Sequence, residues 1–394
     1  MILKLPYWRL SNFYFFYFAS LGALIPYFGL YLKSNGYTAW HVGLVIAVIQ
    51  GTKIIAPYLW GWLADHKQRR LGVIRMAAFF TFIAFGFVAQ ADSLTGVLLA
   101  SFVFSFFWNA MLPQFEALTF SLLKDQPSDY SRIRLWGSFG FVLAVTACGA
   151  AFDVISVNYL PLVVVLILAC TWVASLLVTE PSNTGSATHA GSFKSVLFKK
   201  HVIAFLLICF LVQMSHGPYY SFFSIALNDL GYSELQIGQF WSLGVVAEIV
   251  LFIFIGAMAQ KIGLRAILLA SILLTIVRWL MLAWLADSFI SLIFVQLLHA
   301  ASFGAFHVVA IQLIHQYFYG QFQGRGQALY SSVGYGAGGM CGSLIAGMLW
   351  DEVGATWVFT LAAAFSGLAF VIAWLWVARD QKKVELSERD FNAV

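Results

Sequence analysis

Charged side chains are scarce in this chain. Asp, Glu, Lys and Arg make up 10% of its 394 residues, whereas 61% are hydrophobic and the mean hydropathy is +0.85. This scarcity excludes a soluble domain with an ordinary charged surface, and it also excludes a disordered chain. The net charge of +5 does not indicate nucleic-acid binding, because the positive-inside pattern of membrane proteins explains where the basic residues lie. We therefore expect a lipid bilayer around the chain and no nucleic-acid partner.

Cysteine is also scarce. The four cysteines, Cys148, Cys170, Cys209 and Cys341, lie within apolar runs at no spacing that suggests a metal site or a disulfide framework. The sequence also lacks a nucleophile–base constellation and a nucleotide-binding loop. We predict neither an enzyme nor a bound metal or cofactor. The first apolar run is too long for a signal peptide and lacks a small-residue cleavage site, which favours a retained first span.

Apolar runs of about 20 residues, the length that a spanning helix needs, recur from end to end. They predict an all-α membrane protein with twelve transmembrane helices, at 8–32, 40–64, 72–91, 95–123, 133–152, 159–179, 201–228, 235–259, 264–286, 290–318, 326–350 and 355–378. The segment 181–200 is the only long polar linker, and it separates a six-helix bundle at 1–180 from a second at 201–378. Residues 379–394 then form a short tail.

The loops predict how the chain is oriented in the membrane. If the N-terminus is cytoplasmic, cytoplasmic segments hold all but three of the 22 Lys and Arg residues, the exceptions being Lys33, Lys53 and Arg278. The opposite loops carry mainly Asp and Glu. This asymmetry is the positive-inside pattern. We therefore expect a bacterial-type inner membrane protein with both termini, the linker and the tail in the cytoplasm.

An internal repeat relates the two halves. A shift of 195 residues places NGYTAWHVGL on the segment around Gly231, Gly61 on Gly256, and Arg70 on Arg265. The shared offset indicates duplicated halves of six spans in parallel orientation. This is the arrangement of the major facilitator superfamily, in which the substrate site lies between the halves near the bilayer midplane.

Four charged residues fall well inside the predicted spans, away from their ends. Glu248 and Arg278 lie at similar depths on consecutive helices, so we expect them to pair, and Lys53 and Glu116 are candidates for a second pair. Charges in a membrane span usually mark functional sites. We assign proton coupling to Glu248 and Glu116, and substrate binding to Lys53 and Arg278. The alternative for each pair is a purely structural ion pair.

Other polar and aromatic residues are candidates for lining the site. His299, His307 and His315 recur at intervals of eight in the tenth span, where His299 and His307 share a broad face and His315 drifts away from it. The seventh span adds three more candidates, His216, Tyr219 and Tyr220. We predict that His299 and His307 contact the substrate with these three, although each histidine is also compatible with a packing role.

The loop GWLADHKQRR, residues 61–70, resembles the signature loop of the major facilitator superfamily. By this resemblance Gly61 allows close helix approach, while Asp65, Arg69 and Arg70 belong to the cytoplasmic latch between the halves. Its copy in the second half replaces the Asp with Gln260. An ordinary basic cytoplasmic loop is the alternative interpretation.

Several distinctive segments, among them YSRIRLWGSFGF, RWLMLAW and LLHAASFGAFHVVAIQ, resemble the phenylpropionate permease branch of this superfamily. That branch is related to lactose permease and to nucleoside–proton symporters. The resemblance implies a proton-driven importer of a small aromatic carboxylate such as 3-phenylpropionate. We expect a monomer that works by alternating access. Alternatives are a symporter for a neutral sugar, a nucleoside or a cell-wall fragment, a drug exporter, and a membrane sensor that transports nothing.

Overall fold

The computed structural model describes residues 5–67, 69–123, 128–179, 193–318 and 322–377. Most of the predicted linker and the whole tail lie outside these ranges. Throughout the described ranges the secondary structure is helical, without a strand.

The first half of the chain contains seven α-helices and three short 3₁₀ turns among its described residues. They are α1 (Leu5–Ser34), α2 (Ala39–Gly51), η1 (Thr52–Ile54), α3 (Ala56–Lys67), α4 (Arg70–Gly86), η2 (Val88–Gln90), α5 (Leu94–Leu122), α6 (Ser128–Phe152), η3 (Val157–Tyr159) and α7 (Leu160–Leu176). We call the part from α1 to α7 the N half.

The described part of the second half begins with the short helix α8 (Phe193–Leu197). The C half consists of α9 (Lys200–Asp229), α10 (Glu234–Ile262), α11 (Leu264–Trp284), α12 (Phe289–His299), α13 (Phe306–Tyr317), α14 (Gln323–Tyr330) and α15 (Gly339–Trp376). Two π-helical turns interrupt it, η4 (Ala300–Ala305) between α12 and α13, and η6 (Ser331–Gly338) between α14 and α15.

Eleven continuous helical stretches in the described ranges are long and apolar enough to cross a membrane. The last, Gln323–Trp376, has 54 residues, and Gly354 breaks it with the non-helical angles φ 76° and ψ 171°. Divided at Gly354 it supplies two spans, which agrees with the twelve predicted. The second span is continuous through η1, and the tenth is continuous through η4.

The two copies of the repeat share the same helix start. Thr38 caps α2 and Ser233 caps α10, each through a reciprocal capping box with the third residue of its helix. Gly36 and Gly231 precede these caps with φ of 80° and 85°, a conformation that residues with a Cβ rarely adopt. The 195-residue offset is therefore visible in backbone geometry.

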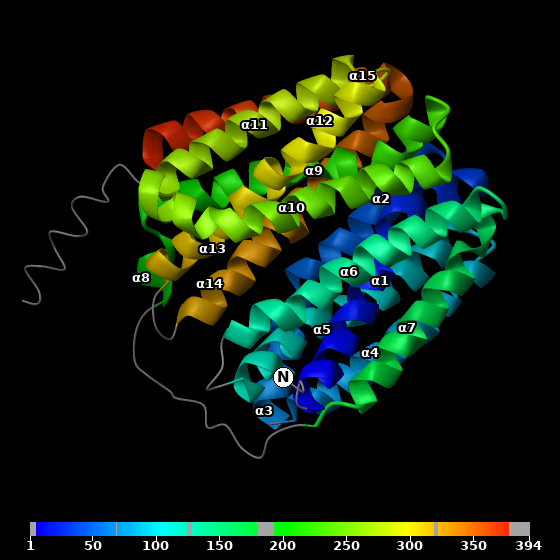
Figure 1. The fold of residues 1–394 in the computed structure, drawn as a ribbon, viewed down its shortest axis with the longest axis horizontal. Helices are drawn as coiled ribbons and strands as arrows, with labels where there is room; N and C mark the ends of the chain where they lie inside the picture. The colour runs from blue at the N-terminus through cyan, green and yellow to red at the C-terminus, as the bar shows by residue number, and fades with distance from the viewer. Residues whose placement is uncertain (1–4, 68, 124–127, 180–192, 319–321, 378–394) are drawn as a thin grey trace, which may run out of the picture.

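The two halves form separate bundles that lie side by side (Figure 1). They contact each other mainly where α2 packs on α15, α6 on α10, and α1 on α9. Glycines allow close approach at the crossing of α2 and α15, where a Cβ added to Gly43 would lie 2.7 Å from Cα of Gly347.

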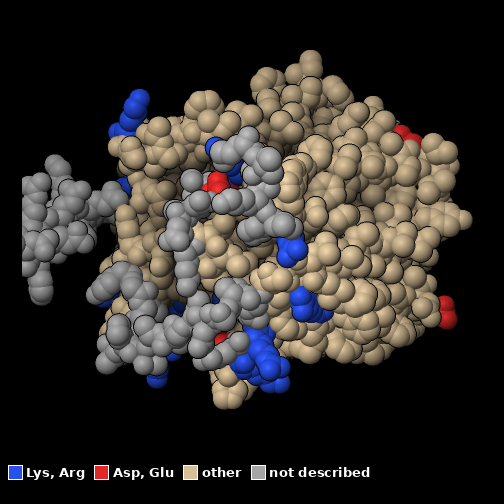
Figure 2. All heavy atoms as spheres, turned by 60° about the horizontal axis from the view of Figure 1, so that its bottom comes forward, with Lys and Arg blue, Asp and Glu red and all other residues tan. Residues whose placement is uncertain are grey.

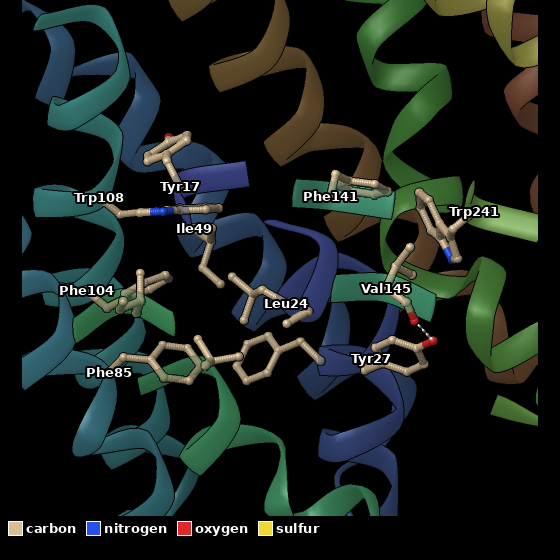
Figure 3. Close-up of a cluster of buried hydrophobic side chains, with 14 of the residues drawn as sticks. Tyr17, Leu24, Tyr27, Ile49, Phe85, Phe104, Trp108, Phe141, Val145 and Trp241 are labelled. Atoms are coloured by element: carbon tan, nitrogen blue, oxygen red, sulfur yellow. Dashed lines mark hydrogen bonds between the residues drawn. The ribbon is translucent and has the colours of Figure 1, made fainter. Parts of the chain in front are cut away.

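The contacts between the halves concentrate at one end, which we call the outer end because the charge pattern predicts that it lies outside the cytoplasm. The Tyr27 hydroxyl donates to the carbonyl of Val145 in its own half and to that of Glu234 in the other, at 2.8 and 3.2 Å. Trp241 of the C half lies near Tyr27 and Val145 (Figure 3). Lys33 also forms an ion pair with Asp229 across the halves.

The apolar core follows the same division. One cluster runs through the N half and continues into C-half residues near the outer end, such as Phe222, Trp241 and Trp279. A second cluster contains only C-half residues toward the opposite, inner end, such as Phe205, Leu268 and Phe318. On the face drawn in Figure 2, Lys and Arg gather toward one end with a few acidic groups among them, while the charged groups visible at the opposite edge are acidic.

Candidate functional site

Glu248 lies in the middle of α10, and its partner is a histidine. Its Oε2 atom is 3.7 Å from Nε2 of His299, and 16% and 8% of the two side chains are exposed. The predicted pair of Glu248 with Arg278 is wrong, because among the described residues the only group within ion-pair distance of this carboxylate is His299. The similar depth of Glu248 and Arg278 did not determine the direction in which each helix presents its side chain.

Arg278 points into the C half instead. Its Nε donates to the carbonyl of Val295 at 2.9 Å and its Nη1 to Oγ of Ser302 at 3.0 Å. The guanidinium carbon lies 4.3 Å from the ring centre of Tyr219 and 4.6 Å from that of Trp279. The residue is completely buried. A solute between the halves therefore does not reach Arg278 in this conformation.

The tenth span presents a stacked row of rings. Phe303 lies between His299 and His307, with ring centres 5.3 and 6.1 Å away and interplanar angles of 5° in both cases. A regular α-helix would rotate His307 about 80° from His299. The π-helical turn η4 changes this rotation and brings the three rings into one row.

The His307 end of this row contacts two tyrosine hydroxyls. Nδ1 of His307 lies 3.1 Å from the hydroxyl of Tyr330 and 3.0 Å from that of Tyr335. His315 lies apart from the row, exposed, with Nε2 at 2.8 Å from Nε2 of Gln327.

The three candidates of the seventh span divide into two groups. His216 is completely buried, and its Nδ1 is 2.8 Å from the carbonyl of Val212. Tyr219 is also buried and donates to Oε1 of Gln296 at 2.9 Å. Tyr220 is only partly buried, and its ring stacks with Trp241 at 6.2 Å. Tyr220 is thus the most accessible of the three.

Lys53 lies in η1, the 3₁₀ turn within the second span. Its Nζ donates to Oε1 of Gln50 at 2.6 Å and lies 6.0 Å from the ring centre of Tyr335 in the C half. Ser332 of η6 donates across the halves to the carbonyl of Ile54 at 3.1 Å. The second predicted pair is also wrong, because the ion pair of Glu116 is with another residue.

That residue is Arg134 of α6, which the positive-inside pattern groups with the cytoplasmic basic residues. Its Nε is 4.0 Å from Oε1 of Glu116, and the two side chains are 30% and 35% exposed. The guanidinium lies 3.8 Å from the ring centre of Phe18, and Tyr130 donates to Glu116 at 3.4 Å. Arg134 is also near enough to Glu248 in the other half to interact with it electrostatically. Its place in the distinctive segment YSRIRLWGSFGF was the available signal.

An ion pair connects two residues of the signature loop to each other. Nη2 of Arg70 donates to Oδ1 of Asp65 at 2.6 Å, and Arg69 precedes the first turn of α4. A Cβ added to Gly61 would lie 3.4 Å from Nε2 of Gln114, so this glycine faces α5 of its own half. In this conformation the ion pair of Asp65 is therefore with its own loop.

Two apolar depressions have no charged residue among their lining residues. One of about 300 Å³ is bordered by α2, η1, α5 and α15, with Phe102 and Leu344 among its lining residues. The other, of about 440 Å³, lies between α4 and α5 and is lined by residues such as Phe80 and Leu99. Their exposed apolar side chains suit contact with lipid chains.

Comparison with known proteins identifies the family. Residues 7–361 match the model of the MFS_1 like family. The chain is 30% identical over 379 residues to the probable 3-phenylpropionic acid transporter of Escherichia coli (strain K12), covering 92% of this chain and 96% of that protein. It is 26% identical over 370 residues to the maltose permease of Geobacillus stearothermophilus, covering 91% and 92%.

A solved structure shows the same fold. A crystal structure of a mutant of the nucleoside transporter NupG superposes with a TM-score of 0.81 at 17% identity, covering 94% of this chain and 98% of that one. At this identity the likeness concerns the fold alone. The predicted superfamily and the all-helical fold are confirmed, and so is the prediction that the chain is a transporter and not an enzyme.

Proposed function

This chain belongs to the MFS_1 like family of membrane transporters, and from that premise we propose that it is a proton-coupled importer of a small organic solute. The cargo we propose is an aromatic carboxylate such as 3-phenylpropionate. A relative at 30% identity, named a probable 3-phenylpropionic acid transporter, supports this choice of cargo. Family membership supports alternating access between two halves.

The arrangement of charge between the halves carries the proposal. Glu248 lies at the middle of α10 beside His299, and the N half contributes two cations, Arg134 in the second turn of α6 and Lys53 in η1. A charge at such a depth is unfavourable unless it has a partner or contacts water. A carboxyl group that gains and loses a proton there can couple the protein's conformation to proton movement. We assign proton coupling to Glu248 with His299, and a supporting role to Glu116 with Arg134.

The same region offers the two kinds of contact that an aromatic acid needs. Arg134 or Lys53 would neutralise the negative charge of the solute's carboxylate, since charge-assisted hydrogen bonds are stronger than those between neutral groups. Tyr220, Phe303 and Tyr335 would pack on the aromatic ring, and His307 would donate a hydrogen bond. His216, Tyr219 and Arg278 would then support this surface from inside the C half.

The conformation supports one assignment in the transport cycle. Polar and apolar contacts join the halves at the outer end, through Lys33 with Asp229 and through Tyr27. The C half has a core of its own toward the inner end. We assign this conformation to the inward-facing state, in which proton and solute leave to the cytoplasm. Asp65 and Arg70 would join the other half only in the outward-facing state.

We propose the predicted membrane placement as well. The basic end seen in Figure 2 supports a cytoplasmic inner end, and hence both termini in the cytoplasm of a bacterial inner membrane. We also propose bundles at 1–180 and 201–378, the linker 181–200, the tail 379–394, and a monomer as the transporting unit.

The test is uptake of labelled 3-phenylpropionate into vesicles that contain the purified protein. An inward proton gradient should drive accumulation in the wild type. Glu248→Gln should abolish accumulation but leave exchange of internal for external solute intact, because exchange needs no net proton transfer. Normal, pH-dependent accumulation by this variant would exclude Glu248 as the coupling residue.

A neutral sugar or nucleoside is the second candidate cargo. The partly exposed Glu116–Arg134 pair favours it, because a carboxylate and a guanidinium together can accept from and donate to hydroxyl groups. The maltose permease among the relatives supports the same cargo class. Competition separates the two: inhibition of uptake by aromatic acids alone favours the first candidate, and inhibition by sugars or nucleosides favours the second.

A further inference from the structure

Two glycines on opposite helices contact the Glu248–His299 pair. A Cβ added to Gly304, in η4, would lie 3.0 Å from Cγ of Glu248. One added to Gly244, in α10, would lie 3.4 Å from Cβ and Cδ2 of His299. The contacts are reciprocal: the acid of α10 packs on a glycine of the tenth span, and the histidine of the tenth span packs on a glycine of α10.

The π-helical turn makes this reciprocity possible. His299 and Gly304 are five residues apart, and in a regular α-helix such residues point about 140° away from each other. The wider turn η4, Ala300–Ala305, reduces that angle. One turn of the tenth span therefore presents both the histidine and the glycine to α10.

The remaining space around Gly304 is also filled. The same added Cβ would lie 3.4 Å from Leu251 and Phe252, both on α10. Because interiors are close-packed, an extra methyl group at Gly304 would displace either the Glu248 methylenes or the two helices. The side chain of Glu248 is the nearest of these obstacles.

We propose that Gly244 and Gly304 are positioning residues that hold the Glu248 carboxylate beside His299 in the geometry that proton coupling requires. This inference rests on the proposed function. The titratable and charged groups that face Glu248 are His299 of α12, Arg134 of α6, Tyr220 of α9 and Tyr335 of η6. Moving the carboxylate away from His299 changes its distance to every one of them.

The experiment compares Gly304→Ala and Gly244→Ala with the control Gly367→Ala. Gly367 lies in the second part of α15, and no atom lies within 4 Å of an added Cβ there. Proton-driven accumulation and solute exchange are measured in vesicles over a series of pH values. We expect Gly304→Ala to lose accumulation about tenfold, because small displacements of a functional group have large effects, and to shift its pH profile. Exchange should stay within about twofold of the wild type, the effect of Gly244→Ala should be smaller, and the control should behave as wild type.

Two results would overturn the inference. One is an unchanged accumulation and pH profile in both glycine variants. The other is a proportional loss of accumulation and exchange, which is the result of general packing damage. If Gly304→Ala does not fold, Gly244→Ala decides, because the nearest contact of its new methyl group is 3.2 Å. Glu248→Gln is measured in parallel: if it accumulates solute normally, the proposed function fails on its own account.

Discussion

Asp153, which follows α6, contacts the C half, and this contact can exist only while the outer end is closed. Its Oδ2 accepts from Oγ of Ser233 and its Oδ1 from the backbone N–H of Leu235, both at 3.1 Å. An acid of the N half thus caps the first turn of α10 in the C half. This contact must break when the outer end opens, so Asp153→Ala should favour the open state.

The magnitude follows from the geometry. Loss of a capping side chain removes about 1 kcal/mol from helix stability, and the charge at the helix N-terminus adds a few tenths. Because this contact exists only while the outer end is closed, the equilibrium should shift toward the open state by about fivefold to tenfold. The control is Asp92→Asn, an exposed acid on another outer turn.

The assay measures access from the outer side. Thr146 donates to or accepts from Ser242 across the halves at 3.0 Å, so Thr146→Cys places a thiol in the closed interface. Its rate of labelling by a membrane-impermeant maleimide should rise about fivefold with Asp153→Ala and remain unchanged with Asp92→Asn. The protein without Thr146→Cys measures the labelling of the native cysteines. An unchanged rate with Asp153→Ala, or an equal rise with Asp92→Asn, would show that the Asp153 contact does not hold the outer end closed.

Three further predictions concern packing and charge. Gly43→Ala should lower the unfolding free energy by about 1–3 kcal/mol, because its methyl group would meet the backbone of Gly347. Thermal melting in detergent measures this, and the control Gly256→Ala, where no atom lies within 4 Å of the added methyl group, should leave the unfolding free energy unchanged. Arg278→Lys should also lower the melting temperature, since an ammonium group cannot reproduce two directed hydrogen bonds while lying between two rings; a melting temperature equal to that of the wild type would contradict this. Arg134→Ala should raise the KM for 3-phenylpropionate about tenfold or more, as loss of a charge-assisted hydrogen bond implies; an unchanged KM would remove Arg134 from the substrate site.

The features that depend on local sequence could be predicted. The lengths of the apolar runs predict the spans. The last two predicted spans form one continuous helical stretch in the structure, and Gly354 marks the boundary between them. The repeat predicted equivalent halves, and Thr38 with Ser233 shows that the equivalence extends to the capping of helices.

The pairing of charges could not be predicted, because depth along a helix leaves its rotation open. Glu248 and Arg278 lie on neighbouring helices, yet one contacts His299 and the other Ser302. The π-helical turn η4 alters the rotation of the tenth span, and no pattern in the sequence signalled it. Arg134 was missed for a different reason: the positive-inside pattern explains an arginine near the end of a span without a functional role.

Glu248 carries a proton in step with the solute in the mechanism we propose. The most direct measurement is the pH outside weakly buffered vesicles when 3-phenylpropionate is added without an imposed gradient. We expect the wild type to alkalinise the outer medium as proton and solute enter together, and Glu248→Gln to take up solute down its gradient with no pH change. Alkalinisation by the variant equal to that of the wild type would contradict this mechanism.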